Sequence, residues 1–276
     1  MSDTPRIGIY QKDHPILRTQ LDAARYLVKP TVGVTQRSLQ QYEDAIVDQG
    51  PTSSCMGHGT SQALTVSYAA AGQTLPFRPS PKLIYELLRI LDRQTPAEKL
   101  QDVGAMPARV PQALSFWGIQ PMVMETTADG RVSDIDPSNV NDEPRLLELE
   151  TSGLKLVTGE YRVDETSSSF TDMICAAVAG GQNPSCALGI GLFVDTQNFM
   201  AYDGSMPVDT IDTSDPQGGG HWLALDYFYT DAMLGVVFGG PNSWGLGWGK
   251  NGHYEITARC LQRVCSDCYL LNVGAS

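Results

Sequence analysis

A turn-rich loop that runs straight into an apolar helix constrains the fold more than any other stretch. Residues 48–54, Asp-Gln-Gly-Pro-Thr-Ser-Ser, carry the glycine, proline and hydroxyl residues that are typical of turns. Residues 62–71 are mostly apolar and include good helix formers, and Gly72 is placed to end the helix. A helix with so little polar surface is predicted to be central and buried.

The start of this helix, at or beside Cys55, is a favourable place for a nucleophile. The first turn of a helix presents unsatisfied N–H groups and the positive end of the helix dipole. A cysteine at that point is expected to form a thiolate more readily than an ordinary thiol. The alternative is an inert buried thiol, the usual state of a free cysteine. We favour the nucleophile because suitable partners occur elsewhere in the chain.

Those partners are a base, a group that orients the base, and a donor for an oxyanion. His221 follows three glycines and opens a strand-like run, while Asn242 begins the stretch Asn-Ser-Trp-Gly-Leu-Gly-Trp-Gly-Lys-Asn-Gly. Gln49 precedes Cys55 by six residues, and its amide could donate to an oxyanion beside the Cys55 backbone N–H. His58, one helical turn beyond Cys55, competes as the base but lies on the same helix instead of across a cleft.

Together, and in this chain order, these stretches resemble the papain-like cysteine peptidases, a family that includes papain, the cathepsins and bleomycin hydrolase. The resemblance is strongest over residues 48–72 and 215–257, and a weaker match covers Asp102-x-Gly104 and Gly118. Two departures surround the nucleophile. Met56 follows it where the family usually has an aromatic residue, and Ser53-Ser54 precede it where the family usually has Gly-Ser.

The resemblance implies a cysteine-type endopeptidase in which Cys55 attacks the scissile carbonyl and His221 serves as thiolate partner and then as general acid. It further implies that Asn242 orients the imidazole and that Gln49 helps to hold the oxyanion. Substrate contacts are implied for Gly104, Gly220 and Trp244, and Trp244 is also expected to cover the Asn242–His221 hydrogen bond. No metal or cofactor is required.

Two other classes of function remain open. Attack of Cys55 on the carbonyl would form a covalent acyl-enzyme. If an amine instead of water released the acyl group, the protein would be a transpeptidase or amide-transferring enzyme. Alternatively, the fold could be a catalytically silent binding or structural module. The intact set of Cys55, His221, Asn242 and Gln49 argues against a silent module, because drift tends to remove one member first.

Composition narrows the partners to a peptide or protein substrate. The net charge of −12 and the lack of a basic patch argue against nucleic acid. No apolar run approaches the length of a membrane span, and the N-terminus lacks the pattern of a signal peptide. We therefore expect a cytoplasmic location, which includes a viral product acting in a host cytoplasm, and reduced thiols. The sequence leaves the oligomeric state open.

The resemblance implies an α+β, papain-like fold of two lobes with the cleft between them, in one domain over residues 1–276. Residues 48–124 should form a mainly helical lobe, and residues 154–276 an antiparallel β lobe that forms a partly closed barrel. Residues 1–47 are expected to be an N-terminal extension packed on the body, too short for the usual inhibitory pro-domain. Residues 125–153 are predicted to be an acidic insertion, and a solvated loop is favoured over a calcium site.

Local patterns predict the individual elements. Ser80 and Pro81 should begin a helix with one wide apolar face, and Gly118 should stop a further helix over residues 111–117. Another helix is predicted over residues 168–179. A short strand at residues 7–10 and a short helix around residues 20–27 are predicted in the extension. Further strands are predicted over residues 154–163, 187–194, 222–229, 233–238, 253–256 and 269–273, with a hairpin turn at Thr230-Asp231.

The remaining cysteines are expected to be reduced structural thiols. Cys265 and Cys268 form a Cys-x-x-Cys with Cys260 nearby, but a structural zinc needs a fourth ligand, for which His253 is the one candidate. Redox pairs usually begin a helix, whereas this pair runs into a predicted strand. Cys175 and Cys186 are interpreted in the same way.

Overall fold

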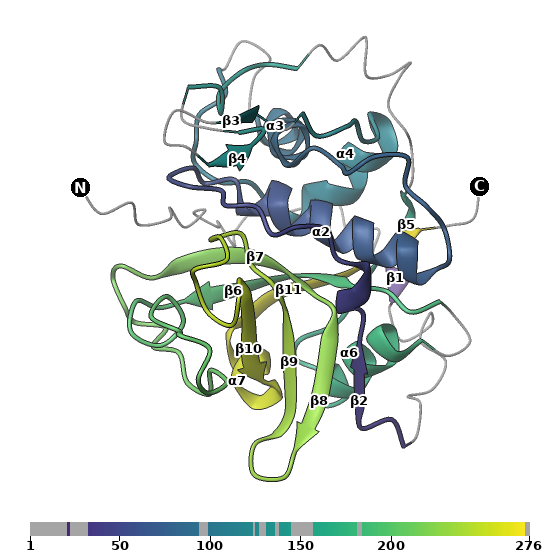
Figure 1. Cartoon of the computed structure of the whole chain (residues 1–276), viewed down its shortest axis with the longest axis vertical. Coiled ribbons are helices and arrows are strands. Elements are labelled where there is room, and N and C mark those ends of the chain that lie inside the picture. Colours follow the sequence, from purple (N-terminus) through teal and green to yellow (C-terminus); the bar gives the residue numbers. More distant parts are fainter. Residues whose placement is uncertain are drawn as a thin grey trace.

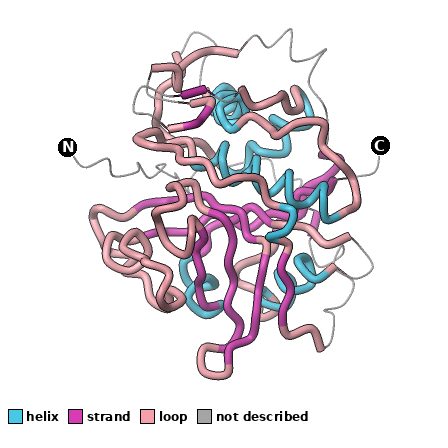
Figure 2. Tube along the Cα trace, in the orientation of Figure 1, coloured by secondary structure: helices cyan, strands magenta, loops and turns pink. Residues whose placement is uncertain are grey.

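Helices and strands separate into two lobes on either side of one central helix. A computed structural model describes residues 21–22, 33–93, 99–123, 125–126, 131–135, 138–144, 157–180 and 184–273. Helix α2 (Cys55–Ala70) lies between a part rich in helices and loops and a part built mainly from strands (Figure 1). Figure 2 shows the same division by secondary structure. The predicted α+β class and the order of the lobes along the chain are confirmed.

Two glycines allow α2 to be held tightly from both sides. All residues from Cys55 to Leu64 are buried, as predicted for a central helix. A Cβ atom added at Gly57 would lie 2.1 Å from the carbonyl oxygen of Pro81. One added at Gly59 would lie 2.8 Å from Cδ1 of Trp222. The backbone of α2 therefore approaches the neighbouring helix on one side and the β lobe on the other more closely than any larger residue would permit.

The helical lobe is built on α3 (Pro81–Asp92), which begins as the sequence predicts. The Ser80 side chain accepts a hydrogen bond from the backbone N–H of Leu83 at 3.0 Å, and proline occupies the first helical position. The buried face of α3 packs on α2. The short helix η2 (Pro107–Arg109) leads into α4 (Val110–Phe116), which differs from the predicted helix by one residue at each end. Gly118 follows it with a φ of +75°.

Part of the predicted acidic insertion is bound to the helical lobe instead of being solvated. It contains the strand pair β3 (Glu125–Thr126) and β4 (Val132–Ser133), and Ile135 and Val140 are buried. Asp142 is exposed, as the prediction requires, but Asp134 is buried and accepts a hydrogen bond from Ser80 Oγ at 2.5 Å. The prediction failed here because it considered local charge and not these long-range partners.

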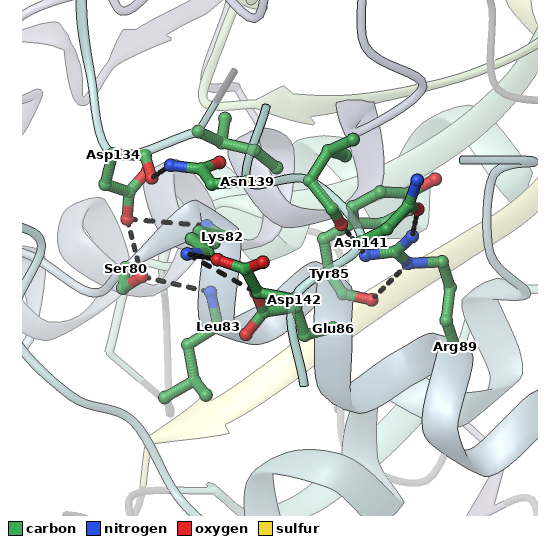
Figure 3. A network of polar contacts seen from close by, with 12 residues as sticks. Ser80, Lys82, Leu83, Tyr85, Glu86, Arg89, Asp134, Asn139, Asn141 and Asp142 are labelled. Carbon is green, nitrogen blue, oxygen red and sulfur yellow. Dashed lines mark hydrogen bonds and ion pairs between the residues drawn. The ribbon is translucent and has the colours of Figure 1, made fainter. Parts of the chain in front are cut away.

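A polar network on α3 holds this segment (Figure 3). Lys82 Nζ lies 3.2 Å from an Asp142 carboxylate oxygen and 3.7 Å from one of Glu86. The Arg89 guanidinium donates to Asn141 Oδ1 at 3.0 Å and to the Val140 carbonyl. Charged side chains on one helix thus provide specific partners for the backbone and side chains of residues 134–142.

Glu86 in this network should make stability depend on pH. Burial raises its pKa from 4.5 to about 8, while Lys82 and Arg89 act in the opposite direction. The unfolded chain releases this proton above about pH 4.5 but the folded chain keeps it to about pH 8, so the contribution of Glu86 to stability decreases across that window. We expect Glu86→Gln to match the wild type near pH 4.5 and to be more stable near pH 8 by on the order of 1–3 kcal/mol. Denaturant unfolding at several pH values measures this, and identical pH dependence in the two proteins would contradict it.

The β lobe consists of two sheets, and strand β7 of the first is followed directly in the sequence by strand β8 of the second. One sheet has the order β1-β5-β11-β6-β7 and the other the order β10-β9-β8-β2. All these pairs are antiparallel except β1 with β5. The bounds are β1 (Leu21–Asp22), β2 (Gln36–Ser38), β5 (Val157–Arg162), β6 (Leu188–Val194), β7 (Gly219–Leu225), β8 (Tyr227–Asp231), β9 (Gly235–Pro241), β10 (His253–Thr257) and β11 (Cys265–Val273). In the described part of the chain these sheets are open, and no closed barrel is formed.

Helices α6 (Phe170–Ala179) and α7 (Ala258–Val264) accompany these sheets (Figure 1). The helix predicted over residues 168–179 is α6, which begins two residues later and ends at the predicted residue, whereas α7 was not predicted from the sequence. The 3-10 helix η1 (Gln40–Tyr42) follows β2. The predicted strand over residues 222–229 is two strands, with Asp226 between them. No helix in the described ranges is long and apolar enough to span a bilayer.

The N-terminal extension departs from prediction where the structure describes it. Leu21 and Asp22 form strand β1, paired with Tyr161 and Arg162, so the helix predicted around residues 20–27 is wrong at these two positions. Hydrogen bonds to the edge of a sheet outweigh a weak local helix preference there. The rest of that helix and the strand predicted at residues 7–10 lie outside the described residues. Residues 36–38 pair with β8, and Leu39 and Val47 are buried.

Candidate active site

Cys55 and His221 line one pocket between the two lobes. Cys55 is the first residue of α2, and His221 lies on β7. The pocket has about 270 Å³ of empty space. Its other lining residues are Met56, Ala105, Pro107, Gly191, Gly220, Trp222 and Ser266. The structure therefore brings together a thiol, an imidazole and the predicted substrate-binding residue Gly220, which are far apart in the sequence.

The hydrogen bonds of Asn242 determine which nitrogen of His221 carries the proton. Asn242 Oδ1 lies 2.7 Å from the backbone N–H of Ser243 and 2.8 Å from His221 Nε2. A backbone N–H only donates, so the Asn242 atom between them is the amide oxygen. His221 Nε2 must then donate to it, which leaves Nδ1 as the basic nitrogen of the neutral ring.

Burial makes this imidazole neutral at ordinary pH. His221 is 3% exposed, and the loss of solvent lowers its pKa to about 4, with the Asn242 hydrogen bond acting in the opposite direction. Its Nδ1 is buried and makes no hydrogen bond to the described residues. The ring is therefore an available base, and a charged imidazolium would need a negative partner nearby.

Aromatic side chains cover the His221–Asn242 pair. The ring of Trp244 stacks on His221 with centroids 4.6 Å apart and an angle of 27°. Phe199 contacts both rings at their edges, at 6.4 Å from His221 and 6.0 Å from Trp244. Trp244 is 7% exposed. It thus lies where the sequence analysis expected a cover, and it limits the access of water to the hydrogen bond.

Gln49 is fixed by bonds to its own loop and to the residue after Asn242. Its backbone N–H donates to the Ser243 carbonyl at 2.8 Å, and its Oε1 accepts from Ser243 Oγ at 2.5 Å. Its Nε2 donates to the Thr52 carbonyl at 2.6 Å. Because that carbonyl only accepts, the orientation of the Gln49 amide is determined. Ser243 lies within the Asn-Ser-Trp stretch but was not predicted to be this partner.

Asp102 connects the nucleophile loop to the segment that holds Gly104. Its carboxylate accepts from the backbone N–H of Ser53 at 2.8 Å and from the Tyr85 hydroxyl at 2.9 Å. The same hydroxyl accepts from the backbone N–H of Gly104 at 2.9 Å. Gly104 has a φ of +86°, a conformation that suits glycine. Its neighbour Ala105 lines the pocket, so this set of bonds determines where one wall of the pocket lies relative to Cys55.

His58, the competing base, lies in a different environment from the thiol. It lines a second cavity that Asn242 also lines, and it is absent from the residues that line the Cys55 pocket. Its Nδ1 lies 3.0 Å from the Ser54 carbonyl oxygen. Burial lowers its pKa to about 4. This position favours His221 over His58 as the base.

The other five cysteines are poor nucleophiles. Burial raises the pKa of Cys175 and of Cys186 to about 12 and that of Cys260 to about 11, and it raises the pKa values of Cys265 and Cys268 as well. No group of three or more metal-ligating side chains occurs in the ranges that the structure describes. His253, the candidate fourth zinc ligand, instead places Nε2 2.7 Å from a Glu43 carboxylate oxygen.

Several solved structures that are similar to this chain are cysteine proteases. Xylellain, a cysteine protease from Xylella fastidiosa, matches with a TM-score of 0.70 and 18% identity over 100% of this chain and 99% of its own. A procathepsin B from Trypanosoma congolense matches with a TM-score of 0.62 and 13% identity over 98% and 87%. Bromelain from Ananas comosus, in complex with an inhibitor, matches with a TM-score of 0.58 and 14% identity over 87% and 100%.

No protein-family model and no curated protein matches the sequence. The similarity to solved structures is therefore a similarity of fold. The chain has the papain-like cysteine protease fold that the sequence motifs imply, and the match to xylellain covers both lobes.

Proposed function

We propose that this protein is a cysteine peptidase that hydrolyses peptide bonds through Cys55, His221 and Asn242. The observation that carries the proposal is the arrangement of His221. Its Nε2 proton is committed to Asn242 Oδ1, which leaves Nδ1 as the basic nitrogen of a ring that lines the same pocket as Cys55. A nucleophile, a base and an orienting group, each from a different element, are the minimum that covalent catalysis of this kind requires.

In the proposed reaction His221 Nδ1 accepts the thiol proton as Cys55 Sγ forms a bond to the carbonyl carbon of the substrate. The oxyanion of the tetrahedral intermediate accepts hydrogen bonds from the Cys55 backbone N–H and from Nε2 of Gln49. His221 then donates its Nδ1 proton to the leaving amine, and the carbon–nitrogen bond breaks. Water, deprotonated by the same nitrogen, then forms a bond to the carbonyl carbon of the thioester. The carbon–sulfur bond breaks, the acid leaves, and the proton returns from Nδ1 to Cys55 Sγ.

Burial of His221 implies that the two charges of the thiolate and imidazolium appear together. The pKa of His221 is lowered to about 4 because its ring is removed from solvent and has no anionic partner. A thiolate on Cys55 would supply that partner, and Asn242 Oδ1 accepts from Nε2–H in both charge states of the ring. The proton therefore moves within a pair that stays neutral overall, which avoids burial of an isolated charge.

The walls of the pocket suggest the kind of side chain that the substrate carries there. Met56, Ala105, Pro107 and Trp222 provide apolar surface in the pocket that Cys55 lines, and Gly191 and Gly220 line the same pocket. Pockets of this composition prefer apolar groups. We propose a peptide or protein substrate with an apolar side chain close to the scissile bond.

A thiol-directed peptidyl epoxide should modify Cys55 much faster than the other cysteines. Burial holds the other five thiols protonated at neutral pH, and Cys55 alone is partnered by the basic nitrogen of His221 in the proposed site. Peptide mapping by mass spectrometry after short exposure measures the order of labelling. If Cys265 or Cys268 were labelled first, the assignment of the nucleophile would be wrong.

A peptide-library digestion with wild-type protein and with Cys55→Ala tests the activity itself. We expect cleavage at sites with a shared apolar preference, and none with Cys55→Ala. An added amine nucleophile identifies a transferase, because the amide product would then exceed the hydrolysis product. A protein that reacts with the epoxide at Cys55 but neither cleaves nor transfers would be a silent module, which would contradict the proposal.

A further inference from the structure

A second cavity lies against Asn242. Its lining includes His58 and Gln62 from α2, Arg78 from the loop before α3, Trp222 from β7, and Asn242 with Ser243. Trp222 lines both this cavity and the Cys55 pocket, so one indole ring contributes to the walls of both. The reaction proposed above makes no use of this cavity, although it shares Asn242 with the catalytic site.

Five side chains that line this cavity have buried polar atoms without a hydrogen-bond partner among the described residues. Two of these atoms are donors, Nε1 of Trp222 and Nε of Arg78, and the Arg78 Nε lies 3.9 Å from an Asp44 carboxylate oxygen. The other three belong to two residues of α2 and to Asn242. They are Nδ2 of Asn242, Nε2 of His58 and Oε1 of Gln62. The three residues are between 3% and 6% exposed. A buried polar atom left unpaired costs roughly 1–3 kcal/mol, so five of them at one cavity indicate a common partner.

The donors and acceptors among these atoms are complementary. Asn242 Oδ1 accepts from Ser243 N–H and from His221, so Nδ2 of Asn242 is a donor. His58 Nδ1 lies 3.0 Å from the Ser54 carbonyl oxygen, which can only accept, so Nδ1 carries the proton and Nε2 of the neutral ring is an acceptor. Gln62 Oε1 is also an acceptor. With Nε1 of Trp222 and Nε of Arg78, three donors and two acceptors therefore belong to residues that line this cavity.

The cavity is large enough for one small molecule that bridges these polar atoms. Its empty space is about 260 Å³ with open solvent included, similar to that of the Cys55 pocket, and its enclosed part has room for about one water molecule. Water needs two to four polar partners in such a place. A water molecule that accepts from Asn242 Nδ2 can donate one hydrogen to His58 Nε2 and the other to Gln62 Oε1. These three atoms are then satisfied, and the water can accept one further hydrogen bond, from Trp222 Nε1 or Arg78 Nε.

We propose that His58 and Gln62 are positioning residues that hold the Asn242 amide through a water molecule in this cavity, and thereby keep the proton of His221 on Nε2. The inference rests on the proposed function, because its consequence for activity passes through the His221–Asn242 pair. His58 and Gln62 are four residues apart on α2, so they lie on the same face of that helix. Helix α2, which carries Cys55, then also orients Asn242, and Asn242 orients the base His221.

The electrostatic surroundings keep His58 in the required neutral form. Burial lowers its pKa to about 4, and Arg78, Arg131 and His221 act in the same direction, against the Ser54 carbonyl. A protonated His58 would donate from both nitrogens and could not accept a hydrogen from the water. Without the water-mediated contact to His58 and Gln62, only the oxygen of the Asn242 amide is hydrogen-bonded. Rotation about the bond to the amide group would then place the donor Nδ2 at His221 Nε2. That would favour the His221 tautomer with its proton on Nδ1.

The test compares His58→Phe, which removes the acceptor and keeps a ring, with His58→Gln, whose amide oxygen can reach about the same place as Nε2. We expect kcat to fall about tenfold in His58→Phe and in Gln62→Leu with little change in KM, and to recover largely in His58→Gln. Thr60→Val is the matched control on the same helix, because Thr60 is buried with an unpaired hydroxyl but lines neither cavity. It should keep wild-type kcat.

A double-mutant comparison distinguishes positioning from general damage to the fold. If His58 acts through Asn242, then His58→Phe should cost nothing further in an Asn242→Ala background. Equal fold losses in both backgrounds would overturn the inference, as would wild-type kcat in His58→Phe. The melting temperature of each variant identifies any loss that is due to unfolding.

A spectroscopic measurement tests the inference even if the protein proves to have no peptidase activity. The imidazole Nε2–H of His221 should give a downfield proton signal in Cys55→Ala, identified by its disappearance on His221→Ala. We expect this signal to broaden by faster exchange with solvent in His58→Phe and to sharpen again in His58→Gln. An unchanged signal in all variants would refute the positioning role, whereas absent turnover with the expected signals would refute the proposed function alone.

Discussion

Replacement of His221 by alanine should reduce kcat/KM by at least about four orders of magnitude, and Cys55→Ala should reduce it to a similar level. The reason is that each variant removes one half of a proton-transfer pair in a buried pocket where solvent cannot substitute for it. Residues that act as one unit are strongly non-additive, so the double variant should be little worse than either single one. Steady-state kinetics on a peptide selected from the library measures all three.

The control for this experiment is His58→Ala, the other buried histidine near the site. It should retain far more activity than His221→Ala, because His58 lies at the second cavity and its Nδ1 is engaged by the Ser54 carbonyl. If His221→Ala kept most of the activity while His58→Ala abolished it, the base would have been assigned wrongly. Circular dichroism and melting temperature should accompany each variant, since both histidines are buried.

Elements with a strong local signal could be predicted from the sequence. Helix α3 is an example, because Ser80, Pro81 and the apolar face that follows specify its start and its buried side without reference to the rest of the chain. The proximity of the motif residues could also be predicted, because they lie in short stretches that resemble one known family in the same chain order. His221, Asn242 and Trp244 indeed lie together in the structure.

Elements held by distant partners could not be predicted in this way. Strand β2 has no buried side chain and no apolar alternation, and it is defined by backbone pairing of Gln36–Ser38 with β8. Strand β1 is too short to have a pattern and depends on pairing with β5. Helix α7 did have a local signal, because the Thr257 hydroxyl accepts from the Cys260 N–H as an N-cap, but the cysteine-rich composition drew the interpretation toward metal and redox motifs.

The polar contacts around the site show the same limit. Arg131 donates to the Asp48 carbonyl at 2.6 Å, from a segment that the sequence suggested was a solvated insertion. Asp102 holds Ser53 and Tyr85, which are distant in the chain. The role of Ser243 at Gln49 and the cavity shared by His58 and Asn242 depend on the packing of α2 against the β lobe. Such relations follow from the three-dimensional arrangement, which periodicity alone does not reveal.

Gln49→Ala is the second variant for which we expect a large loss of activity. Its replacement by alanine should lower kcat by about two to three orders of magnitude with a smaller change in KM, the loss that follows removal of one oxyanion donor. The Gln49 amide is oriented by Thr52 and Ser243, and its Nε2 carries a second hydrogen beyond the one given to the Thr52 carbonyl. Asn242→Ala should cost less than His221→Ala, because Asn242 orients the base without being the base.

Ser243→Ala is the matched control, because it removes the hydroxyl at Gln49 Oε1 and leaves the donor nitrogen in the protein. We expect a loss of kcat that is intermediate between the wild type and Gln49→Ala, since the amide is then held by its Nε2 bond to Thr52. In a Gln49→Ala background the same change should have little effect, because no amide remains to be oriented. If Gln49→Ala instead raised KM and left kcat unchanged, Gln49 would contact the ground-state substrate, and the oxyanion would need another donor besides the Cys55 backbone N–H.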